Sequence, residues 1–152
     1  MKKFAALFLA LVLLLTLFAG CSGKNSGKDK KDNTLEGTYH LETVKGQSPA
    51  DFFKSSDEDA QQTNSYYHLD ELSEKSLNNL ATLIVKEDGT WELSYAEDAI
   101  KSDSGVWEKE EDGRICFSQH VGRIFYAEFK NGTLTFDEGL HKLHDMKLVY
   151  GK

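Results

Sequence analysis

Three Asp-Gly or Asn-Gly pairs constrain the fold of this chain more than any other feature of its sequence. They fall in the stretches VKEDGTWELSY, WEKEEDGRICFS and AEFKNGTLTF. Such pairs readily supply the positive φ angles of tight turns between antiparallel strands, and each pair is flanked by β-branched and aromatic residues. The sequence therefore predicts three β-hairpins within one short region.

Alternation of apolar and polar side chains supports this prediction. Trp91, Leu93 and Tyr95 share one face of a strand, and Leu134 and Phe136 share another. A first strand in LEGTYHLETVKG and a last one in MKLVYGK raise the expected number to seven or eight. We predict an all-β fold, an antiparallel up-and-down barrel or half-barrel. The stretch RIFYAEF is apolar on both faces for much of its length, so we expect a central strand that is well covered.

The region between Gly46 and Asn79 breaks the strand pattern. Ser48 and Pro49 suit the N-cap and first position of a helix, which we predict over residues 49–54. Four leucines at helical spacing predict a second, amphipathic helix that covers a barrel mouth or the sheet: Leu69, Leu72, Leu77 and Leu80. The polar stretch SSDEDAQQTNS between the two predicted helices is expected to be a mobile loop.

The N-terminus has the layout of a secretory signal. Lys2 and Lys3 precede a run from Phe4 to Phe18 in which Thr16 is the only polar residue. A permanent membrane span is the alternative, but it needs about 20 apolar residues and this run is shorter. We assign residues 1–20 to a signal peptide.

The residues Phe18-Ala19-Gly20-Cys21 resemble the lipobox of bacterial lipoproteins. The resemblance implies that the Cys21 thiol takes a diacylglyceryl group and that signal peptidase II cuts before it. Two acyl chains give a lasting hold on a bilayer, where one chain binds only marginally. The predicted partner is therefore the lipid bilayer, and the predicted location is the extracytoplasmic face of the cell membrane.

Residues 21–33 are expected to be the lipidated cysteine and a flexible linker. From Ser22 to Asn33 the chain has no apolar side chain, so no burial would offset the entropy cost of ordering it. The linker lysines either settle on anionic lipid or stay solvated. Residues 34–152 are then long enough for one domain with a single core.

Several short motifs in this domain resemble the lipocalin-like domains of many short bacterial lipoproteins. They are LEGTYHL in the first predicted strand, Gly105-Val106-Trp107, the repeated Asp-Gly hairpins and the terminal MKLVY. The resemblance implies a small antiparallel barrel or half-barrel.

Charge narrows the range of functions. Residues 34–152 hold 12 Lys and Arg against 23 Asp and Glu, a net charge of −11. Such a field repels nucleic acid, and no basic stripe interrupts it. Cys116 is the one cysteine besides Cys21, and its place between Ile115 and Phe117 favours a structural thiol in a strand.

Motifs for catalysis or for a cofactor are absent from the sequence, so we predict neither an enzyme nor a bound cofactor. Metal binding is one alternative, because His141, His144 and Asp145 lie close together in sequence and His40 and His120 could join them. On a strand His141 and His144 would point to opposite faces, so the site requires a turn or helix there. Isolated surface histidines are the other reading.

The aromatic residues support two further hypotheses. We assign six of them to a candidate pocket for a small apolar ligand: Tyr39, Trp91, Tyr95, Trp107, Phe117 and Tyr126. The same side chains could instead fill an eight-stranded barrel. In that case the domain serves as an interaction or structural module that presents its surface to an envelope protein.

Overall fold

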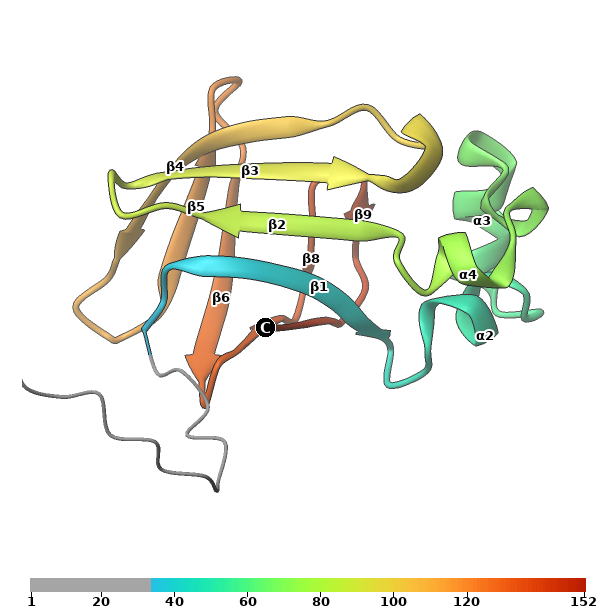
Figure 1. The fold of residues 1–152 in the computed structure, drawn as a ribbon, viewed down its shortest axis with the longest axis horizontal. Helices are drawn as coiled ribbons and strands as arrows, with labels where there is room; N and C mark the ends of the chain where they lie inside the picture. The colour runs from blue at the N-terminus through green and yellow to red at the C-terminus, as the bar shows by residue number, and fades with distance from the viewer. Residues whose placement is uncertain (1–33) are drawn as a thin grey trace, which may run out of the picture.

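The computed structural model describes residues 34–152, which form a closed antiparallel barrel in the order β1–β10–β7–β6–β5–β4–β3–β2 (Figure 1). The strands are β1 (Gly37–Val44), β2 (Ala81–Val85), β3 (Thr90–Tyr95), β4 (Asp103–Lys109), β5 (Ile115–Gln119), β6 (Ile124–Lys130), β7 (Thr133–Phe136) and β10 (Leu148–Gly151). The predicted all-β barrel is confirmed. The predicted signal peptide (1–20) and lipidated linker (21–33) lie outside the described residues.

The three predicted hairpins join β2 to β3, β4 to β5, and β6 to β7. Gly89 and Gly113 have φ angles of 81° and 89° in the first two turns. In the third turn both Asn131 and Gly132 have positive φ, at 52° and 74°. These local signals determine three of the barrel's strand pairings, because the turn of a hairpin sets the register of its two strands.

Buried apolar side chains alternate with more exposed ones along β2, β3 and β7, and one irregularity keeps apolar residues facing inward in β1. The register of β1 against β10 shifts between Leu41 and Thr43. Glu42 is the extra residue at this bulge, which lets Leu41 and Val44 both face the core although they are three positions apart. The interior is therefore lined by apolar residues from all eight strands.

The prediction that RIFYAEF is well covered is wrong for its outer face. Phe125 and Ala127 point inward, but Ile124 is 54% exposed and Tyr126 is 42% exposed. The helices gather at one end of the barrel (Figure 1), so they leave the outer face of β6 uncovered.

Three α-helices and a 3₁₀ turn follow β1: α2 (Pro49–Phe53), α3 (Glu58–Tyr67), η2 (Leu69–Glu71) and α4 (Glu74–Leu77). The predicted first helix is confirmed as α2, where the Ser48 hydroxyl accepts from the Asp51 amide at 3.1 Å. Phe52 and Phe53 of this helix are fully buried, with ring centroids 5.0 Å apart. The helices thus share the core of the barrel.

Most of α3, the longest helix within residues 34–152, lies in the stretch predicted to be a mobile loop. Asp57 is its N-cap and accepts from the Asp59 amide at 3.0 Å. Lys45 then holds both carboxylates, with its Nζ 2.9 Å from Asp57 and from Asp59. Only Ala60 and Thr63 of the helix are buried, so apolar periodicity gave no signal for it.

The amphipathic helix predicted from four leucines is also wrong. Leu72 is extended, with φ −71° and ψ 154°, and it separates η2 from α4. Ser73 begins α4 by accepting from the Ser76 amide at 3.1 Å. Leu69, Leu77 and Leu80 are nevertheless fully buried, as their apolar character requires.

A small two-stranded sheet of β8 (Gly139–Leu140) and β9 (Leu143–His144) lies between β7 and β10 in the chain, and η3 (Ala96–Asp98) follows β3. Leu140 and Leu143 of this hairpin are fully buried.

Within residues 34–152 no helix has the length and apolar character needed to cross a membrane. The start of β1 lies at the barrel end opposite the helices (Figure 1).

Candidate functional site

The larger interior side chains pack on one another. Trp91 of β3 contacts Phe117 of β5, with ring centroids 6.0 Å apart. Phe117 lies 5.3 Å from Phe136 of β7, and Phe136 lies 5.8 Å from Tyr150 of β10. All four rings are fully buried, so a continuous line of aromatic contacts joins opposite walls of the barrel. This arrangement is typical of a packed core.

The structure distributes the six predicted pocket residues over four places. Tyr39, Trp91 and Phe117 are fully buried inside the barrel. Trp107 is half-buried, and its indole N–H donates to the Lys86 carbonyl at 2.9 Å, beside the β2–β3 turn.

Tyr95 belongs to a separate polar group, and Tyr126 lies outside the barrel. Tyr126 pairs with Cys116 on the face opposite the inward-pointing Phe117, and Arg114 stacks over its ring at 4.4 Å. The prediction that Tyr126 lines an interior pocket is therefore wrong, because the side chain is on the outer face of β6.

A buried polar group ties the β8–β9 hairpin to the barrel. The Tyr95 hydroxyl lies 3.3 Å from His141 Nδ1, and His141 Nε2 lies 3.7 Å from an Asp103 oxygen. The Gln119 amide donates to the same Asp103 carboxylate. These four side chains come from β3, β4, β5 and the hairpin turn, so together they hold the hairpin against the barrel.

Burial shapes the ionisation of this polar group. It raises the pKa of Tyr95 well above its usual value, with smaller contributions from Tyr150 and Asp103. Burial also raises the pKa of Tyr150, whose hydroxyl is fully buried and has no hydrogen-bond partner. Both phenols therefore stay neutral, and neither is prepared to act as a base.

The pKa of His141 is lowered by burial, and Lys142 and Arg123 lower it further while Asp103 opposes them. In the unfolded chain this histidine takes up a proton near its ordinary pKa of about 6.5, whereas in the folded chain it does so only at lower pH. The free energy of unfolding is therefore undiminished above that pH and declines as the pH falls below it. His141→Asn suits the positive φ of 56° at this position. Between pH 7 and pH 5, the free energy of unfolding, measured in urea, should fall less for the His141→Asn variant than for the unsubstituted chain. Equal pH dependence in both chains would contradict this assignment.

The predicted histidine metal site is not assembled. His141 is buried and turned toward Asp103, whereas His144 is exposed and lies 2.7 Å from Asp145. Across residues 34–152, the one group of three histidine, cysteine or carboxylate donors within 4.8 Å of one another is Glu108, Glu110 and Cys116. His141, His144 and Asp145 do not form such a group.

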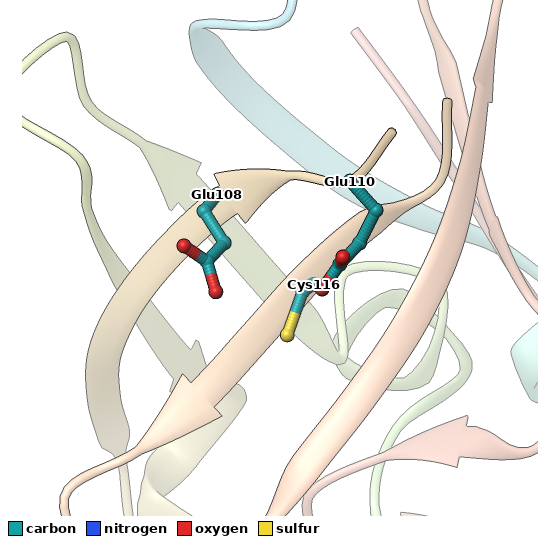
Figure 2. Close-up of side chains that lie close together, drawn as sticks. All are labelled: Glu108, Glu110 and Cys116. Atoms are coloured by element: carbon teal, nitrogen blue, oxygen red, sulfur yellow. The ribbon is translucent and has the colours of Figure 1, made fainter. Parts of the chain in front are cut away.

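Figure 2 shows this second group, in which Glu108 and Glu110 lie beside the Cys116 sulfur. Glu108 is paired opposite Cys116 between β4 and β5, so the strand register brings them together. No sequence pattern distinguishes this group, because its carboxylates belong to a charged run that ends in a turn. Cys116 is 3% exposed, and its Sγ lies 3.7 Å from Ser118 Oγ. We interpret Cys116 as a structural thiol beside two solvated carboxylates.

The outer face of β4, β5 and β6 carries exposed apolar side chains, and we call it the β4–β6 face. Val106, Ser118 and Ile124 are paired in one row across the three strands. Val106 is 52% exposed and Ile124 54% exposed, and Tyr126 lies on the same face two positions along β6. A groove of about 320 Å³ runs beside Tyr126 past Glu128 and Glu138.

A second groove, of about 350 Å³, lies between α3 and the β8–β9 hairpin, and we call it the α3–hairpin groove. Tyr66 and Tyr67 line one side, and Lys142 and His144 line the other. Sequence reasoning missed this groove because it treated the α3 segment as a loop.

Comparison with protein-family models, with curated proteins and with solved structures gave no match to this chain. The candidate sites therefore rest on the geometry of residues 34–152.

Proposed function

We propose that this chain is a lipid-anchored lipoprotein on the extracytoplasmic side of the cell membrane, and that it binds a partner rather than catalysing a reaction. The barrel serves as a packed scaffold, and the β4–β6 face is the surface that meets an envelope protein. The lipobox-like residues before Cys21 support the anchor. The contacting interior rings favour a scaffold over a carrier of an internal ligand.

The exposed apolar side chains on the β4–β6 face carry the proposal. Contiguous exposed apolar residues with a polar border are typical of protein interaction sites. Val106 and Ile124 sit in one row, with Tyr126 close by, and Val121 is 82% exposed in the turn after β5. Burying these side chains against a partner would remove apolar area from water.

Charge indicates the chemistry of that partner. Glu128 and Glu138 line the groove beside Tyr126, and neither forms an ion pair with any residue of the 34–152 range. The domain as a whole is acidic. We therefore propose a partner segment that brings apolar side chains flanked by lysine or arginine.

Site-specific cross-linking in cells tests this proposal. A photoreactive amino acid at Ser118, in the middle of the β4–β6 face, should give a cross-linked protein whose captured peptide contains basic residues. The same amino acid at Ser94, which faces outward from β3, is the matched control and should give none. Ile124→Glu should reduce the Ser118 product at least several-fold, because it places a charge in the apolar row. Two results would contradict the β4–β6 face as the binding surface. One is an equal yield of cross-linked protein at Ser118 and Ser94, and the other is a yield at Ser118 that Ile124→Glu does not change.

A further inference from the structure

The α3–hairpin groove combines two cations with exposed aromatic surface in an otherwise acidic domain. Arg123 and Lys142 both line it, and neither forms an ion pair with another described residue. Of the groove's two carboxylates, Asp59 lies 2.9 Å from Lys45, outside the groove, and Asp145 lies 2.7 Å from His144, which also lines it. The groove therefore has two uncommitted positive charges.

The two cations have a common neighbour, His141. Both Arg123 and Lys142 lower the pKa of the neighbouring His141, so the positive potential of each reaches that side chain. They come from different elements, the β5–β6 turn and the β8–β9 turn. An anionic group placed in the groove could thus be contacted from two sides.

One part of the groove offers aromatic surface to a flat, apolar group. Tyr66 is 71% exposed, which is unusual for a large ring, and its centroid lies 6.3 Å from that of Tyr67. Met146 also lines the groove and is 3% exposed. A volume of about 350 Å³ lies at the lower end of the range for small-molecule sites, so the groove has room for a small ligand.

From this arrangement we propose that the α3–hairpin groove binds a small organic anion, in which a phosphate or carboxylate contacts Arg123 and Lys142 and a flat ring packs against Tyr66. The site goes beyond the proposed partner binding and uses different residues from the Val106–Ile124 row. Either proposal can therefore fail while the other holds. The groove is lined by α3, at the barrel end opposite the start of β1 (Figure 1), which suits a ligand that arrives from solution rather than from the proposed membrane anchor.

Calorimetric titration of the full chain, extracted in a non-ionic detergent, with phenyl phosphate tests the site. At physiological salt the Debye length is about 8 Å, so the domain's overall negative charge is largely screened. We expect saturable binding with one molecule per chain. Inorganic phosphate should bind more weakly because it lacks the ring, and phenol should bind more weakly because it lacks the charge.

Four variants assign the contacts. Arg123→Gln and Lys142→Gln should each weaken phenyl phosphate binding about tenfold, the loss expected for a charge-assisted hydrogen bond. Lys147→Gln is the control, because this exposed lysine pairs with Asp137 and does not line the groove. Tyr66→Ala should weaken phenyl phosphate but leave inorganic phosphate unchanged.

Both substituted cations are exposed, so the variants should keep the circular dichroism spectrum of the parent chain. Two results would overturn the proposal. One is the absence of saturable binding up to millimolar phenyl phosphate. The other is binding that Lys147→Gln weakens as much as Arg123→Gln does, since this would indicate diffuse attraction rather than a site.

Discussion

Replacing Phe117 by alanine is expected to lower the free energy of unfolding by about 3–5 kcal/mol, the usual cost of removing a buried aromatic ring. Phe117 is fully buried and contacts Trp91 on one side and Phe136 on the other. Its loss leaves a cavity at the centre of the aromatic line that joins β3 to β10. Urea unfolding, followed by tryptophan fluorescence, measures the change.

Tyr126→Ala is the matched control for this substitution. It also removes a large ring, from the strand paired with β5, but its side chain points outward and is 42% exposed. We expect it to lower the free energy of unfolding by less than about 1 kcal/mol, because exposed positions away from the core contribute little. Similar small effects of both substitutions would contradict a packed interior.

The barrel could be predicted because its signals are local. Asn131-Gly132 and the two Asp-Gly pairs determine hairpins by their own backbone preferences, and alternation assigns a face to residues such as Trp91 and Leu93. The helix α3 could not be predicted in this way. It is held by the Asp57 cap and by Lys45 from a distant strand end, and neither leaves a periodic apolar pattern.

The candidate sites depend on how distant segments meet, so the sequence predicted little of them. Tyr95 and His141 are 46 positions apart in the chain and touch only because the β8–β9 hairpin folds back onto the barrel. Exposure of Ile124 depends on where the helices lie, which no local pattern indicates. Arg123 likewise joins Tyr66 in one groove only once α3 is present.

Replacing Cys21 by serine is expected to abolish incorporation of labelled fatty acid into the chain and to release it from the membrane fraction. The proposed anchor consists of acyl chains on the Cys21 thiol, and a serine hydroxyl does not offer the sulfur that this lipidation uses. Metabolic labelling with palmitate, followed by cell fractionation, measures both effects.

Cys116→Ser is the control, because it removes the other cysteine and leaves the lipobox-like residues intact. This variant should keep the label and stay with the membrane. A Cys21→Ser chain that remains in the membrane fraction without label would instead support the alternative that residues 4–18 act as a membrane span.

In the proposed function the barrel interior is filled and binding takes place on the outside. Native mass spectrometry of residues 22–152 carrying Arg123→Gln and Lys142→Gln, after incubation with a lipid extract, tests it most directly, since these substitutions remove the proposed anion site. A filled interior predicts the bare mass of the chain. One retained apolar molecule per chain would contradict the account, and the partnerless Tyr150 hydroxyl would then be the group inside the barrel available to bind it.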